Sequence, residues 1–229
     1  MPGRKSKRLS DRTRRPAPVP RAAMPAAGIG NARLFMPQGY EPGYDYPLVV
    51  WLADEDRFDL GRVMARTSLR NFVAVQPGPA ETGEDREDAV WRAIDAARDR
   101  ASIHPGRIFL VGRQAAGTAA FRIACRHPQV FGGVVSIGGP FPLDESAFAR
   151  LRDVRRMPML LCCLAAAARD AAPQTDRTLR LFHAAGAMLA MRIYPGGRDL
   201  SRAVLADVNR WIMDEICGPK PALHSECAR

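Results

Sequence analysis

Short apolar runs alternate with longer stretches of helical periodicity along most of this sequence, and this alternation restricts the fold more than any other feature. The apolar runs have the length and composition of strands buried on both faces of a sheet, and they occur at residues 47–53, 71–76, 108–112, 134–138, 159–164 and 190–194. A further edge strand is expected at residues 33–37. Helical spacing is present at residues 58–69, 84–102, 118–126, 176–185 and 200–216. This order predicts an α/β fold with a mostly parallel central sheet, helices on both of its faces and, because the connections are short, no cap domain.

The chain length allows one domain between two tails. Of the 229 residues, 28–218 carry the alternating pattern and are expected to form a single domain, whereas 1–27 and 219–229 are expected to be tails. No apolar run reaches the length of a membrane span, and residues 1–27 lack the apolar core of a secretory signal. We therefore expect a cytoplasmic protein.

Positive charge is concentrated at the N-terminus. The formal net charge is +10, and residues 1–21 hold eight basic side chains against the single acid Asp11, which leaves only +3 for the rest. A stretch this basic and rich in Pro is predicted to be disordered. It is either a solvated tail or a contact for an acidic partner such as RNA, DNA or anionic lipid. The mildly basic body does not indicate a nucleic-acid surface across the domain.

The cysteines and histidines do not form a metal-binding pattern. The spacing of the five cysteines is not typical of a disulfide framework, and Cys162 and Cys163 are neighbours in an apolar run. The cysteines are therefore interpreted as small buried residues. No Cys/His group has the spacing of a zinc site. We expect neither a metal nor a cofactor. The four histidines are interpreted as structural or solvated side chains: His104, His127, His183 and His224.

One long stretch resembles a known family. Residues 103–117 end in a strand and a Gly-rich turn, residues 119–128 continue as a helix that ends in His127 and Pro128, and residues 134–139 form the next strand. This stretch resembles the nucleophile region of the phospholipase/carboxylesterase and dienelactone-hydrolase branches of the α/β-hydrolase superfamily. The resemblance extends from residues 47–52 to the turn after Tyr194 and implies an α/β-hydrolase fold with carboxylesterase-type chemistry.

The nucleophile position of that family holds a glutamine in this chain. The family's strand-to-helix elbow reads G-x-S-x-G, because a strained turn exposes the serine and glycines permit the turn. Here Gly112 and Gly117 correspond to the elbow glycines, Gln114 stands at the serine position and Ala116 at the following glycine position. An amide is not a nucleophile and forms no acyl-enzyme. No Ser, Cys or Asp lies between Gly112 and Gly117, so a small shift of register supplies no replacement.

The base position of the family also departs from its pattern. The histidine usually follows the last strand in a Gly-Gly-His turn, and this chain has Arg198 there, which stays protonated and is no general base at neutral pH. The acid of the triad corresponds to Asp170, or to Arg169 in the stricter register. An ion pair between Arg198 and either Asp170 or Asp54 is one arrangement that would keep the shape of the family's catalytic site without supporting catalysis.

The oxyanion turn is altered in the same way. The family usually has His-Gly after the first buried strand, and this chain has Ala53 followed by Asp54, Glu55 and Asp56. The backbone N–H groups of Ala53 and Ala115 are the oxyanion-equivalent donors, but nearby carboxylates disfavour an oxyanion unless they face solvent.

Three functions are compatible with these departures. The first is a pseudoenzyme that binds or scaffolds, with Gln114 and Arg198 contacting a small polar or anionic ligand. The second is a carboxylic-ester hydrolase with a non-standard site, for which Ser136, Cys162 or Cys163 or direct attack by water would replace the usual nucleophile. The third is a tethering module whose basic arm binds nucleic acid.

Overall fold

The structure is a computed structural model of the whole chain. It describes residues 27–29, 31–53, 58–80, 85–139, 154–165, 176, 179–180, 182–184, 186–196 and 199–218. Apart from Ala27, the two predicted tails lie outside these ranges, so the domain limits at residues 28 and 218 stay predictions.

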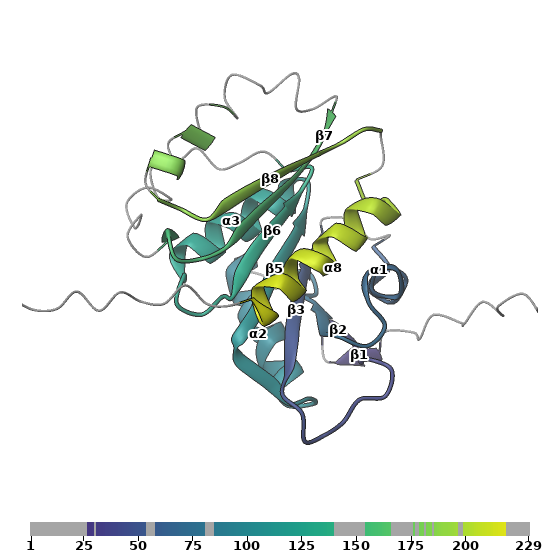
Figure 1. The fold of residues 1–229 in the computed structure, drawn as a ribbon. Coiled ribbons are helices and arrows are strands. Elements are labelled where there is room, and N and C mark those ends of the chain that lie inside the picture. Colours follow the sequence, from purple (N-terminus) through teal and green to yellow (C-terminus); the bar gives the residue numbers. More distant parts are fainter. Residues whose placement is uncertain are drawn as a thin grey trace, which may run out of the picture.

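An eight-stranded sheet runs through the described part of the chain (Figure 1). The strand order is β1-β2-β4-β3-β5-β6-β7-β8; β3 to β8 pair in parallel, whereas β2 is antiparallel to both of its neighbours. The strands are β1 (Ala27–Ile29), β2 (Ala32–Phe35), β3 (Tyr46–Leu52), β4 (Val73–Gln76), β5 (Ile103–Arg113), β6 (Gly133–Ile137), β7 (Met159–Leu164) and β8 (Leu189–Tyr194).

Helices cover both faces of this sheet. Figure 1 shows α1 (Leu60–Thr67) and α8 (Arg202–Cys217) on one face, while α2 (Arg86–Arg98) and α3 (Ala115–Arg126) lie on the other. Each face has its own apolar core, and the central strand β3, buried along its whole length, contributes to both. Leu48, Val50 and Leu52 pack on the α2/α3 side, and Val49 and Trp51 pack on the α1/α8 side. The predicted α/β architecture, with a mostly parallel sheet covered on both faces, is confirmed.

Several element boundaries differ from the prediction. β5 begins at Ile103, which pairs with Tyr46 across an irregular register, so His104 lies inside the strand and not before it. Helix α3 begins at Ala115 instead of residue 118, directly after the strand. β1 is an additional strand that begins at Ala27, a residue assigned to the tail. The connection from β6 to β7 includes residues 140–153, which lie outside the described ranges, so the expected absence of a cap domain stays a prediction.

Within the described ranges, no helix combines the length and the apolar character needed to cross a bilayer.

Glu87 links the two helices on one face of the sheet. Its carboxylate, in the first turn of α2, accepts a hydrogen bond from Arg126 Nη1 at 2.8 Å and contacts His127 Nε2 at the end of α3. The ring of Trp91 lies edge-on to His127, with 5.1 Å between the ring centroids. Burial alone would raise the pKa of Glu87, but the hydrogen bonds from Arg126 and His127 outweigh it and hold that pKa below its usual value.

We expect Glu87→Gln to lower the free energy of unfolding by about 1 kcal/mol at neutral pH, because it removes charge-assisted hydrogen bonds of which one partner is half exposed. The pKa of Glu87 is depressed in the folded state, so its contribution is complete above the unfolded pKa of about 4.3 and is lost as pH falls below it. Denaturant unfolding at a series of pH values should therefore show the two proteins converging in acid.

Asp95→Asn is the control for this prediction. Asp95 forms an exposed ion pair with Arg98 on the same helix, and we expect its loss to change stability very little. A difference between wild type and Glu87→Gln that stays constant down to acid pH would contradict the assigned role of the carboxylate.

Candidate functional site

Gln114 is the single residue between β5 and α3. Its backbone has φ 53° and ψ −126°, and no other non-glycine residue in the described ranges has a positive φ. Side chains are strained in this region of φ/ψ space. Hydrogen bonds hold the turn: Gln114 N donates to Ile137 O at 2.8 Å, and Gln114 O accepts from Gly117 N at 2.9 Å. The surrounding structure therefore imposes a conformation that glutamine does not favour.

Three glycines allow the helix to approach the strands so closely at this turn. A Cβ on Gly112 would overlap the carbonyl of Ala116, and a Cβ on Gly117 would overlap Ser136 Oγ. A Cβ on Gly139, which follows β6, would overlap the carbonyl of Gln114. Gly112 and Gly117 were predicted elbow glycines, whereas the role of Gly139 follows only from the structure, because its contact forms when β6 lies beside β5.

The side chain of Gln114 is exposed and is held by Asp199. Gln114 Nε2 donates to Asp199 Oδ2 at 3.1 Å, and Arg113 Nε donates to the same oxygen at 2.5 Å. Leu200 N donates to the other oxygen, Oδ1, at 2.9 Å. Asp199 is only 9% exposed. A buried carboxylate with a cation and two further donors is well satisfied, so this group fixes the amide in place.

Asp199 is a site residue that the sequence analysis missed. The family pattern directed attention to Arg198, one position earlier in the turn after β8. Arg198 and Asp170 both lie outside the described residues, and so does Asp54, so their assigned positions and the pairs proposed among them stay predictions. The sequence signal that could have revealed Asp199 is that an acidic residue directly follows Arg198, the expected base position.

The two residues assigned as oxyanion-equivalent donors both lie at the carboxyl edge of the sheet. Ala53 directly follows β3 and is half-buried, and Ala115 is the first residue of α3 and is exposed. Parallel strands place these two positions and Gln114 at one edge, where α/β sheets bind ligands. The fold thus brings three of the predicted site residues, Ala53, Gln114 and Ala115, to the same end of the sheet.

The alternative nucleophiles are poorly suited to attack. Ser136 is 1% exposed, and its hydroxyl lies beneath Gly117. Cys162 is buried, and burial raises the pKa of its thiol to about 12 despite a contact with Tyr194 Oη. Burial also raises the pKa of the half-buried Cys163. Thiols with raised pKa values carry little thiolate at neutral pH, and a buried hydroxyl does not reach a substrate.

The described histidines occupy other places in the fold. His104 Nδ1 accepts a hydrogen bond from Gly106 N at 3.1 Å near the start of β5, and His127 contacts Glu87 at the end of α3. His183 lies in a helical stretch between β7 and β8. No cluster of three His, Cys, Asp or Glu side chains in the described part of the chain has the arrangement of a metal site.

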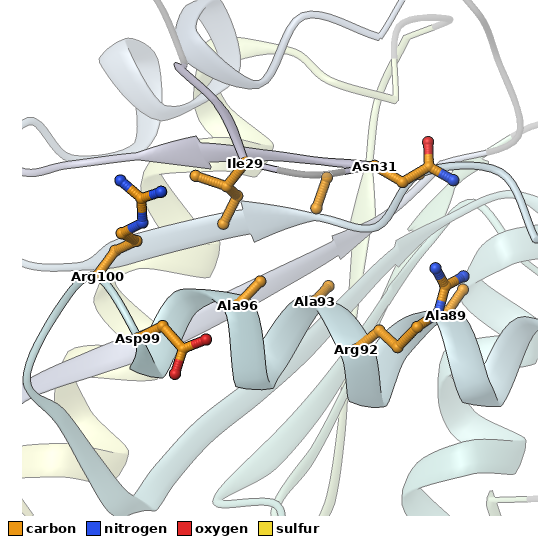
Figure 2. A pocket seen from close by; sticks show the side chains of 10 residues that line it. Ile29, Asn31, Ala89, Arg92, Ala93, Ala96, Asp99 and Arg100 are labelled. Atoms are coloured by element: carbon orange, nitrogen blue, oxygen red, sulfur yellow. The ribbon is translucent and has the colours of Figure 1, made fainter.

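Two adjoining hollows lie on the β1, β2 and β4 side of the sheet, and the larger one reaches Ala53. A cavity of about 600 Å³ opens beyond the ends of β3 and β4, where Ala53 and Gln76 line it. A groove of about 320 Å³ continues from it between α2 and the hairpin of β1 and β2 (Figure 2). Asn31, Gly78 and Ala89 line both hollows. Among the candidate site residues, only Ala53 therefore lines concave surface in these two hollows.

Comparisons with known proteins identify the fold. No protein-family model matches the chain, and no curated protein matches it. Among solved structures, a ferulic acid esterase aligns with a TM-score of 0.62 at 15% identity, over 80% of this chain and 91% of that one. A thermostable esterase aligns with a TM-score of 0.60 at 18% identity, and this chain spans 58% of its length. An S-formylglutathione hydrolase from Staphylococcus aureus aligns with a TM-score of 0.55 at 12% identity, over 75% of this chain and 82% of that one.

Together with the strand order, these likenesses show that the chain has the α/β-hydrolase fold and that its structural neighbours include esterases. At identities this low, likeness extends to the fold and not to the activity.

We expect Gln114→Gly to be more stable than Gln114→Ala by about 1 kcal/mol, because both variants lose the amide but only glycine adopts a positive φ without strain. Denaturant unfolding of the two proteins measures the difference. The same pair of substitutions at Gln129, an exposed residue in the turn after α3, is the control, and there alanine should be the more stable. A Gln114→Gly variant less stable than Gln114→Ala would contradict the strained turn.

Proposed function

We propose that this chain is a pseudoenzyme: an α/β-hydrolase-fold protein, related to serine carboxylesterases, that acts by binding or scaffolding instead of Ser-His-Asp catalysis. The observation that carries the proposal is Gln114 in the strained turn between β5 and α3, with its amide held by Asp199. The turn presents one side chain at the carboxyl edge of the sheet. That side chain forms no acyl-enzyme, because an amide has no nucleophilic form.

The residues around Gln114 support a ligand-binding role better than a catalytic role in hydrolysis. Asp199 is the nearby carboxylate, and Arg113, Gln114 and Leu200 already donate to its two oxygens. Both oxygens that would have to accept a proton from water are therefore engaged in hydrogen bonds. The Oε1 of a glutamine amide whose Nε2 is already fixed is an acceptor suited to hydrogen-bond a polar ligand.

A carboxylic-ester hydrolase with a non-standard site is the second candidate. Esterases are prominent among the structural neighbours, and the backbone donors at Ala53 and Ala115 are compatible with residual stabilisation of an oxyanion. An oxyanion hole and substrate binding without a triad accelerate hydrolysis by about 10³-fold to 10⁴-fold over the reaction in water, which is far less than a complete triad achieves. The poorly suited nucleophiles Ser136, Cys162 and Cys163 weigh against this candidate.

Hydrolysis of p-nitrophenyl acetate by the purified protein separates the two candidates. We expect release of p-nitrophenol at the rate of buffer with wild type, Gln114→Ala and Asp199→Asn alike. Gln129→Ala is a matched control for the loss of an amide far from the site. Turnover by wild type that disappears in Gln114→Ala or Asp199→Asn but persists in Gln129→Ala would overturn the pseudoenzyme proposal.

A further inference from the structure

Strand β8 forms one edge of the sheet, and its outer side has no neighbouring strand in the described part of the chain (Figure 1). Its six residues pair with β7 in an unbroken parallel register. In such a strand, alternate residues direct their N–H and C=O groups away from the paired side. Between Ala190 and Tyr194, these outward groups form no backbone hydrogen bond within the described ranges. β8 therefore presents free donors and acceptors with which another strand can pair.

The features that usually protect an exposed edge do not occur in β8. Natural edge strands are kept from pairing by short length, proline, lysine, bulges or exposed charge. The opposite edge, β1, has only three residues, and one of them is Gly28. β8 is longer and has no proline, glycine or lysine. Its one charged residue, Arg192, is directed toward α8, where its Nη1 lies 3.3 Å from Asp207 Oδ1. This edge is therefore open to a partner strand.

Exposed apolar side chains gather at the same edge. Three large apolar side chains are exposed in the described part of the protein, and two of them lie at β8: Met188 is 40% exposed and Ile193 is 58% exposed. Because side chains alternate along a strand, Ile193 lies on the same face as Leu189 and Met191, which pack against the α2/α3 core. The free edge thus carries an apolar row that a second apolar strand can cover.

We propose that β8 pairs antiparallel with β8 of a second copy of this chain, so that a two-fold axis joins the two sheets into one. A two-fold contact uses the same surface on both copies, so the strand must be complementary to itself. With Met191 at the axis, Leu189 of one copy lies opposite Ile193 of the other. This apolar pair occurs twice in the dimer and covers the exposed isoleucine.

Charge complementarity favours the second copy in this register. With Met191 at the axis, each Arg192 lies opposite the small side chain of Ala190 and keeps its ion pair with Asp207 of its own copy. Tyr194 Oη donates to the other oxygen of that carboxylate at 3.0 Å. An axis moved by one residue, to Arg192, would place two arginines opposite each other, which is destabilising. The Met191 register therefore joins two apolar rows without opposing like charges.

The pairing has a consequence for a scaffold. Because the two joined sheets run antiparallel, their carboxyl edges point in opposite directions, and the two Gln114 turns lie at opposite sides of the dimer. The contact uses no residue of that turn, so it is independent of whether the turn binds a ligand or supports hydrolysis.

Sedimentation velocity of the full chain tests the pairing. We expect a monomer–dimer equilibrium in the micromolar range, because one strand edge and its flanking side chains form a small interface. A protein that stays monomeric up to about 100 µM would overturn the proposal.

Ile193→Lys tests the apolar contact. It places a charge twice at the join, and we expect it to raise the Kd of the dimer about tenfold or more. Tyr44→Lys makes the same change at the third exposed apolar side chain, which lies before β3, and should leave the Kd unchanged. A Kd that is unaffected by Ile193→Lys, or raised equally by both substitutions, would contradict an interface at β8.

Ala190→Glu and Ala190→Arg test the register at a residue that is exposed in the monomer. An acid at position 190 lies opposite Arg192 of the second copy, so Ala190→Glu should lower the Kd about fivefold through two new pairs of opposite charge. Ala190→Arg should raise the Kd, because it opposes like charges. If the two variants shift the Kd in the same direction, or leave it unchanged, the proposed pairing is wrong.

Discussion

The close approach of helix α3 to the ends of β5 and β6 is the constraint on which the candidate site depends. Gly112, Gly117 and Gly139 provide that approach, because a side chain on any of them would overlap backbone or Ser136. The approach leaves room for one residue between strand and helix, and Gln114 accepts a strained φ of 53° there. The parallel sheet then places this residue at the edge where α/β folds bind ligands. Under the proposed function, this turn presents the amide of Gln114 where the resembled family has its nucleophile.

The fold does not require a reactive residue at that turn. Its stability comes from two apolar cores, one beneath α1 and α8 and one beneath α2 and α3, and neither includes Gln114 or Asp199. Changes at the edge of the sheet therefore leave the body intact, which is why one fold supports unrelated functions. Asp199 illustrates the consequence: this carboxylate accepts hydrogen bonds from three donors and so orders the turn at the edge of the sheet.

The sequence predicted much of the fold and less of the site. Buried strands such as β3 and β6 have strong apolar signals, and their order along the chain leads directly to a parallel sheet. The short strand β1 has no such signal, because it holds only three residues, one of them Gly28. Asp199 was missed because the family pattern emphasises the neighbouring Arg198, and the contacts of Asp199 come from Arg113 and Gln114, which are remote in sequence. The free edge of β8 depends on the order of the strands in the sheet, which no local pattern encodes.

Covalent labelling with a fluorophosphonate, followed by intact-mass analysis, tests the central claim most directly. The claim is that the turn between β5 and α3 retains the shape of a nucleophile elbow without a nucleophile. Wild-type protein should gain no adduct, because neither Gln114 nor the buried Ser136 presents an activated hydroxyl. A stoichiometric adduct that maps to Ser136, or to any other residue at the carboxyl edge of the sheet, would contradict the account and identify the protein as a working serine hydrolase.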